Sequence, residues 1–193
     1  MGPPVVGRNL SVAVAILFLA AGRPAWAQFS ERLSVSLVDD TYSLTVGVSR
    51  LELLVPKGDL VQLPARVGGS TDSPRYFQLG DLKHGLIISG WFESSNSYRG
   101  MDRYWEEQLA AWKDRNLPTP TNVSIERVGN WDAVFYQLLV SAGSSTHIRA
   151  HLIQAGTWID VHVSVTTQNS AASNRLLAEA LLRSLVVREK PYG

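Results

Sequence analysis

Apolar and polar residues alternate along the segment from Leu33 to Val48. A period of two is typical of a strand that buries one face, and Asp39-Asp40 interrupts the pattern where a two-residue turn would fit. In the register that this turn sets, all apolar side chains fall on one face, so we predict an antiparallel hairpin. The expected pairs are Leu37 with Tyr42, Val35 with Leu44, and Leu33 with Val46.

Other short apolar segments, bounded by glycine, proline or aspartate, predict further strands. Residues 57–74 are rich in Gly, Pro, Ser and Asp and predict a loop. Val186-Val187, near the end of the chain, could return to a sheet edge. The predicted strands cover residues 51–55, 76–79, 86–92, 122–128, 132–140, 146–154 and 157–167.

Two segments have the period of an α-helix. In residues 101–115 the apolar stripe consists mainly of large aromatic side chains, and such a stripe more often packs into a core than lines a ligand pocket. The second helix covers residues 170–185, with Ser170 as a plausible N-cap. The predicted stripes are Met101, Tyr104, Trp105, Leu109 and Trp112 in the first helix, and Leu176, Leu177, Ala180, Leu181 and Ser184 in the second.

Strands joined by short turns favour antiparallel pairing, with the helices packed on the sheet. The sequence therefore predicts an α+β fold: a mainly antiparallel sheet of about six to eight strands with two packed helices. Residues 28–193 have the length of a single domain.

Residues 1–27 read as a cleavable signal peptide. Arg8 precedes an apolar run from Leu10 to Ala21, which is shorter than the roughly 20 residues of a membrane-spanning helix. Ala25-Trp26-Ala27 supplies a small-x-small site, which places cleavage between Ala27 and Gln28. We expect a soluble protein in the periplasm, or outside the cell, with no stable membrane anchor after cleavage.

The amino-acid composition excludes several classes of function for this protein. Without the two arginines of the signal, the chain has 16 basic and 17 acidic residues, and it has no basic block that would favour nucleic acid. It has no cysteine, which excludes thiol catalysis, cysteine-ligated metals and an amino-terminal lipid anchor. We expect no cofactor.

The order of elements resembles the PsbP-like superfamily, which is named for an extrinsic photosystem subunit and shared with a nuclear Ran-binding import factor. The matching parts are the apolar strand and corner Leu51-Glu52-Leu53-Leu54-Val55-Pro56-Lys57-Gly58, the helix from Met101, the strands from Trp131 to Thr167, and the helix from Ser170. The resemblance implies a PsbP-like α/β sandwich and a non-enzymatic role, because the better-described members bind or help assemble other proteins. It supplies no active-site residues.

The hairpin of residues 146–167 carries the most distinctive cluster of polar residues. A turn at Ala155-Gly156 would pair His151 with Asp160 and Arg149 with His162 on one face. The same face would carry His147, Ser164 and Trp158. It could be a solvated sheet face, or it could bind a partner through Arg149, His151, Trp158, Asp160 and His162.

Chemistry at this face is the third alternative. His151, His162 and Asp160 could converge on a metal ion, or His151 and Asp160 could form a base–orienter pair. We assign no catalytic residue and no metal ligand, because neither an oxyanion hole nor a strained nucleophile turn is evident.

Three functions follow. The first is an exported, non-enzymatic binding or accessory protein whose partner is a protein or small ligand, acting through the polar face or the loops around the first helix. The second is a metal-dependent or His–Asp hydrolase that uses His151, Asp160 and His162. The third is an immunity-type inhibitor of an exported toxin.

Overall fold

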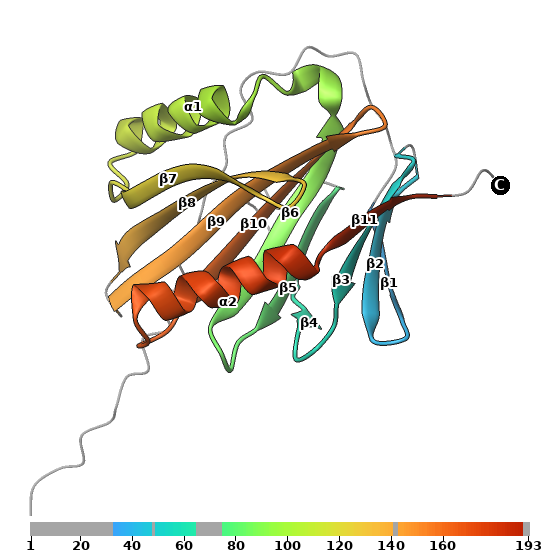
Figure 1. The fold of residues 1–193 in the computed structure, drawn as a ribbon, viewed down its shortest axis with the longest axis horizontal. Coiled ribbons are helices and arrows are strands. Elements are labelled where there is room, and N and C mark those ends of the chain that lie inside the picture. Colours follow the sequence, from blue (N-terminus) through green and yellow to red (C-terminus); the bar gives the residue numbers. More distant parts are fainter. Residues whose placement is uncertain (1–32, 48, 65–74, 141–142, 191–193) are drawn as a thin grey trace, which may run out of the picture.

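The computed structural model describes residues 33–47, 49–64, 75–140 and 143–190 (Figure 1). The signal peptide and its cleavage site, and residues 65–74 of the loop predicted at 57–74, lie outside these residues. The strands of the described part are β1 (Leu33–Val38), β2 (Thr41–Val46), β3 (Leu51–Pro56), β4 (Val61–Gln62), β5 (Tyr76–Asp81), β6 (Leu86–Ser94), β7 (Thr121–Val128), β8 (Trp131–Val140), β9 (Gly143–Gln154), β10 (Thr157–Thr166) and β11 (Val186–Glu189). The helices are the 3-10 turn η2 (Ser95–Ser97) and the α-helices α1 (Met101–Asp114) and α2 (Ala171–Ser184).

The described strands form two sheets in which every pairing is antiparallel. One has the order β1-β2-β3-β11, and the other has the order β4-β5-β6-β10-β9-β8-β7. The α+β class and the antiparallel pairing predicted from the sequence are confirmed. The short strand β4 lies where only a loop was predicted.

The first hairpin has the register that its alternation predicts. Leu37 pairs with Tyr42 and Leu33 with Val46, and the turn residues Asp39 and Asp40 have φ angles of 45° and 56°. Two successive positive φ values give a turn whose twist matches that of the strands, and aspartate tolerates this backbone region. Strand β3 pairs antiparallel with β11, which forms an edge of this sheet, as predicted for Val186-Val187.

The seven-stranded sheet is covered on both faces. One face packs against α2 and the four-stranded sheet, and these elements together bury the main core. The other face lies beneath α1, which buries a smaller cluster with β8 (Figure 1). Strand β8 serves both layers, since Ala133 and Phe135 face the main core while Val134 and Tyr136 face α1.

Helix α2 begins as predicted, because the Ser170 hydroxyl accepts a hydrogen bond from the Ser173 amide at 3.2 Å. The predicted buried stripe holds only at Leu181, which packs against the main core. Leu176 is 70% exposed and Leu177 40% exposed, whereas the buried residues of the helix are Asn174, Ala178 and Leu182.

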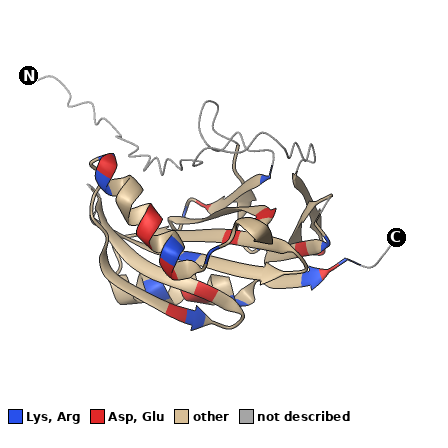
Figure 2. Cartoon of the chain, turned by 90° about the horizontal axis from the view of Figure 1, so that it is seen from above, with Lys and Arg blue, Asp and Glu red and all other residues tan. Residues whose placement is uncertain are grey.

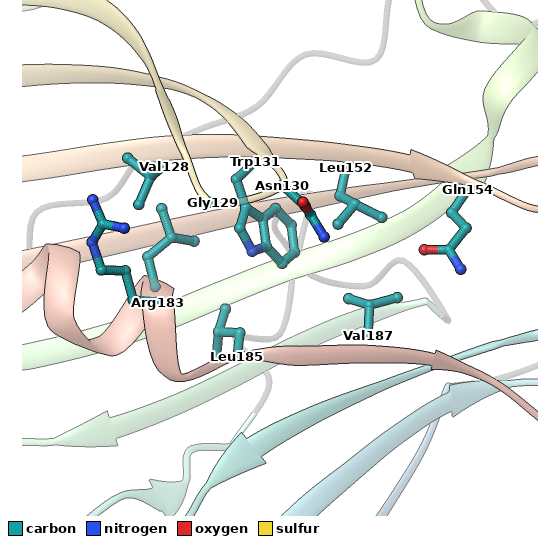
Figure 3. A pocket seen from close by; sticks show the side chains of 10 residues that line it. Val128, Gly129, Asn130, Trp131, Leu152, Gln154, Arg183, Leu185 and Val187 are labelled. Atoms are coloured by element: carbon teal, nitrogen blue, oxygen red, sulfur yellow. The ribbon is translucent and has the colours of Figure 1, made fainter.

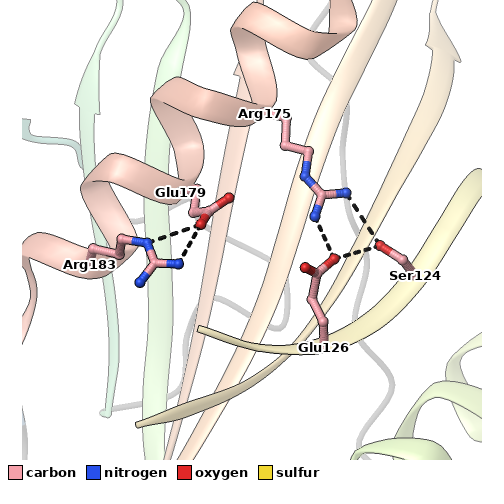
Figure 4. Close-up of polar contacts among 5 residues, drawn as sticks. All are labelled: Ser124, Glu126, Arg175, Glu179 and Arg183. Carbon is pink, nitrogen blue, oxygen red and sulfur yellow. Dashed lines mark hydrogen bonds and ion pairs between the residues drawn. The ribbon is translucent and has the colours of Figure 1, made fainter. Parts of the chain in front are cut away.

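Contacts with β7 and β8 fix this rotation of α2. The Arg175 guanidinium lies over the Phe135 ring, 3.9 Å from its centroid, and donates hydrogen bonds to Ser124 and Glu126 (Figure 4). The Glu126 carboxylate accepts from Arg175 and from the Ser124 hydroxyl. Arg175 therefore lies against the sheet, and Leu176 and Leu177 turn away from it.

Neither α-helix of the described residues has the length and hydrophobicity that crossing a membrane requires. Charged residues lie in scattered bands on helices and strand ends in the view of Figure 2, and no face in that view carries a single sign of charge.

Candidate functional site

The hairpin β9–β10 places the predicted cluster as the sequence suggested. Ala155 and Gly156 form the turn with φ angles of 46° and 76°. The register pairs His151 with Asp160, Arg149 with His162, and His147 with Ser164. The residues between them face the main core, so the sequence correctly predicts which side chains share a face.

This polar face is buried, and the expectation of a solvated sheet face is wrong. His151 and Asp160 are fully buried, and Arg149 is only 3% exposed. The covering residues come from α1, from Tyr98 just before it, and from Trp158 on the hairpin itself. Tyr104 of α1 thus packs onto His151, whereas Trp105 and Trp112 of the same helix pack against Tyr136 of β8.

Arg149 and Asp160 form an ion pair at the centre of this layer. Two nitrogens of the guanidinium face the two carboxylate oxygens, with Nε–Oδ1 at 2.8 Å and Nη2–Oδ2 at 3.0 Å. Burial is the largest single effect on the pKa of Arg149 and lowers it, but the Asp160 carboxylate together with Tyr104 and Tyr136 more than offsets burial, so the pKa is raised. The His151 Nε2 atom lies farther off, 3.5 Å from Oδ2 of Asp160. The arginine is therefore the principal partner of Asp160.

His147, His162 and Tyr136 form a second polar group under α1. The rings are stacked, with 2° between the planes of the two histidines and 7° between His147 and Tyr136. Nδ1 of His147 lies 3.1 Å from Nε2 of His162, which is also 3.3 Å from the Tyr136 hydroxyl. Burial lowers the pKa of His147 to about 3. Burial, followed by the nearby His147 and Arg149, also lowers the pKa of His162. Both imidazoles are therefore neutral at pH 7.

Aromatic residues surround the third histidine, His151. Its ring meets Tyr98, Tyr104 and Trp158 edge to face, with centroid distances of 5.3, 4.4 and 4.9 Å. Such geometry suits the ring quadrupole and admits weak N–H···π contacts. Arg149 adds cation–π contacts, 4.8 Å from the Trp91 centroid and 5.6 Å from that of Tyr104.

We call Trp91, Tyr98, Tyr104 and Trp158 the aromatic patch. All four are partly exposed, and all four lie in ring contact with Arg149 or His151. Among the described residues, the Tyr98 hydroxyl and the Trp158 Nε1 group are buried polar groups without a hydrogen-bond partner. Burial, with smaller contributions from the Asp132, Asp160 and Asp102 carboxylates, raises the pKa of Tyr98 to about 12.

The metal alternative at this face gains no geometric support. Within the described residues, one group of three side chains has ligand atoms close enough for one ion, and it consists of Asp59, Asp81 and His84, all within 4.8 Å. It is remote in sequence from the hairpin, and the pairing of β4 with β5 brings Asp59 toward Asp81. His84 hydrogen-bonds Asp81 and lowers the pKa of that carboxyl. The Asp81-x-x-His84 spacing is visible in the sequence, but the approach of Asp59 is not.

A pocket of about 280 Å³ lies on the opposite side of the seven-stranded sheet (Figure 3). Its apolar lining includes the Trp131 ring, Leu152 and Leu185, and its polar lining includes Asn130, Gln154 and Arg183. The sequence does not reveal this pocket, because its walls come from the β7–β8 turn, β9, the end of α2 and β11.

No family model matches the sequence, and a search of curated proteins finds no similar one. A search of solved structures finds cyanobacterial PsbP from Synechocystis, with a TM-score of 0.51 and 12% identity, over 86% of this chain and 98% of that one. The protein has a PsbP-like fold.

Two other solved structures match with TM-scores below 0.5. A Bacteroides thetaiotaomicron protein has 14% identity and a TM-score of 0.44, and the match covers 74% of this chain but only 46% of that protein. A Pseudomonas aeruginosa protein of unknown function has 13% identity and a TM-score of 0.41, over 82% of this chain and 99% of that one. At 12% identity the match to cyanobacterial PsbP bears on the fold alone, and the PsbP-like arrangement agrees with the resemblance in element order.

Proposed function

We propose that this protein is an exported accessory protein that binds another protein through its aromatic patch. The observation that carries the proposal is the ion pair of Arg149 and Asp160, which lies buried directly beneath partly exposed tryptophan and tyrosine rings. Export rests on the signal peptide predicted in residues 1–27, and in a two-membrane bacterium it implies the periplasm.

The energetics of the patch support a binding role. Burying two charges costs several kcal/mol per ion in desolvation, and apolar residues of similar size would often stabilise a core as well or better. Here the pair holds Trp91 and Tyr104 in place from below, while His151 contacts the other two rings. Tryptophan, tyrosine and arginine are the residues that most often dominate the energy of protein–protein interfaces.

The binding residues predicted from the sequence take different parts in this proposal. Trp158 would touch the partner directly. Arg149, Asp160 and His151 would hold the aromatic rings in place, since they are buried beneath them. His162 belongs to the stacked group with His147 and would not reach the partner.

The test is affinity capture with the chain from Gln28 to Gly193 as bait, incubated with extract of the exporting compartment. Captured proteins are quantified by mass spectrometry for wild type, Trp158→Ala, Tyr98→Ala and the control Leu176→Ala, which alters an exposed apolar residue on α2. We expect a protein that wild type and the control retain equally and that both patch variants lose. Equal retention by all four baits would refute the proposal.

A further inference from the structure

Helix α1 covers the two stacked histidines through a series of ring contacts. Trp105 and Trp112 of the helix pack on the Tyr136 ring, with centroid distances of 5.0 and 5.5 Å. Tyr136 in turn stacks on His147 at 4.9 Å. His147 is 2% exposed and His162 is 4% exposed. The helix therefore separates both imidazoles from water.

The contact between the two imidazoles has no place for a proton on each of the facing nitrogens. Nδ1 of His147 and Nε2 of His162 are 3.1 Å apart, so one of them donates and the other accepts. Protonation of both rings would make both nitrogens donors. Among the described residues, the buried Nε2 atom of His147 has no hydrogen-bond partner. A proton added to His147 therefore either breaks the contact with His162 or leaves a buried N–H group unpaired.

The groups around these rings do not compensate a positive charge. Tyr136 of β8 and Tyr104 of α1 stay neutral, because burial raises the pKa of each phenol. Arg149 of β9 is itself positive, and the Asp160 carboxylate of β10 is held by Arg149. The charged side chains of α1 are all exposed. An imidazolium beneath α1 would thus lack both water and an available anion, and removal of the cover is the way to hydrate it.

Mainly side-chain packing holds α1 against the sheet. Strands β9 and β10 are each paired with a neighbour on both sides, and their other face packs in the main core. The ion pairs of Arg103 with Glu106 and Glu107 lie within α1. The N-cap Gly100 makes no side-chain cap hydrogen bond, has a φ angle of 94°, and has no atom within 4 Å of the position that a Cβ would occupy. The helix is therefore the element that can move with the fewest contacts broken, and Gly100 can serve as its hinge.

We infer that α1 is an acid-released lid, which covers His147 and His162 while they are neutral and separates from β8 when they take up protons. Its release exposes both rings to water. Because Tyr104 belongs to α1 and Tyr98 lies just before it, the same movement takes the aromatic patch apart. Control of partner binding by pH rests on the proposed function, whereas the release of α1 does not.

The size of the effect follows from the two states of His147. Burial beneath α1 lowers its pKa to about 3, and an exposed histidine titrates near about 6.5. Between pH 7 and pH 5 this difference shifts the equilibrium toward the open state about 25-fold. The pKa of His162 is also lowered, so His162 adds a change in the same direction.

Thiol labelling tests the release, because the chain has no cysteine and a single introduced thiol reports on one position. Val134 and Val161 are both 0% exposed, but Val134 lies in the cluster beneath α1 and Val161 lies in the main core. Val134→Cys and its matched control Val161→Cys are labelled at pH 7 and pH 5, without urea and in dilute urea. Each labelling rate is divided by the rate of the unfolded protein at the same pH.

We expect the corrected rate at position 134 to exceed that at position 161, and to rise at least about 25-fold from pH 7 to pH 5. Dilute urea should accelerate labelling at position 161 more than at position 134, because release of one helix exposes less surface than global unfolding. In the background His147→Phe/His162→Phe the rise at position 134 should disappear. Equal rates and equal urea dependence at the two positions, or a rate at position 134 that does not rise at pH 5, would overturn the inference without recourse to the histidine variant.

Discussion

Acidification should destabilise this protein through the two neutral histidines stacked under α1. In the native state the pKa of His147 is about 3, and that of His162 is also well below its usual range. In the unfolded chain both should titrate near the ordinary histidine value of about 6.5. Tyr136 and Arg149 are the titratable neighbours of these rings, and neither supplies a negative charge that would favour the imidazolium form.

Proton binding determines whether the free energy of unfolding rises or falls with pH. Between about pH 6.5 and pH 3 the unfolded state binds more protons than the native state, so the free energy of unfolding falls as the pH falls. Well below pH 6.5, protonation of His147 in the unfolded chain lowers the free energy of unfolding by about 1.4 kcal/mol per pH unit. From pH 7 to pH 5 the loss from His147 is about 2 kcal/mol, and His162, whose pKa is also lowered, adds a loss of the same sign. Such a loss is a large part of the stability of an ordinary domain.

The assay is urea unfolding of the chain from Gln28, followed by tryptophan fluorescence at pH 7 and pH 5. The double variant His147→Phe/His162→Phe keeps the stacked aromatic shape and should lose most of the pH dependence. Leu182→Ala removes buried volume elsewhere, so it should be less stable at both pH values and keep the full dependence. A wild-type stability that is the same at both pH values, or higher at pH 5, would refute this reasoning.

Three further predictions follow from the structure. Arg149→Met leaves the Asp160 carboxylate buried and uncompensated and should cost about 3–5 kcal/mol in chemical denaturation, whereas adding Asp160→Leu should recover part of that loss. Gly90→Ala should unfold the protein or lower its melting temperature steeply, because a Cβ there would lie 2.0 Å from the Asp160 carbonyl oxygen; a wild-type melting curve would contradict this. The mass of the exported protein should correspond to a chain that begins at Gln28, and a species that retains Met1 would exclude cleavage after Ala27.

Local patterns were sufficient to predict every described strand except β4, and the registers of two hairpins. A strand places alternate residues on opposite faces, so the apolar positions of β1, β2, β9 and β10 leave one register that buries them together. The pairings of His151 with Asp160 and of Leu37 with Tyr42 follow from turn positions that the sequence makes visible.

The rotation of α2 could not be predicted in the same way. Its apolar residues form two stripes one residue apart, Leu177 with Leu181 and Ala178 with Leu182, and periodicity does not choose between them. The choice depends on long-range contacts, in which Arg175 lies on Phe135 and the Thr167 hydroxyl hydrogen-bonds Asn174. Asn174 therefore faces the sheet together with Ala178 and Leu182, and Leu176 faces solvent.

Burial of the polar face could not be predicted either, because it depends on contacts between segments far apart in the sequence. The sequence shows that His147, Arg149 and His151 share a face, and that α1 carries a stripe of large aromatic residues. The sequence does not show that α1 covers this polar face. The position of α1 depends on the path of the segments before and after the helix, which local patterns do not predict. The pairing of Asp160 with Arg149, where His151 was expected, follows from the arginine reaching both carboxylate oxygens.

The most direct measurement of the central claim is site-specific photo-crosslinking in living cells. A photoreactive phenylalanine derivative replaces Tyr98 in the aromatic patch in one strain and Leu176 on α2 in another. If the patch binds a partner, irradiation should attach one discrete protein to the exported chain at position 98 and not at position 176. No adduct at position 98, or the same adducts at both positions, would contradict the account.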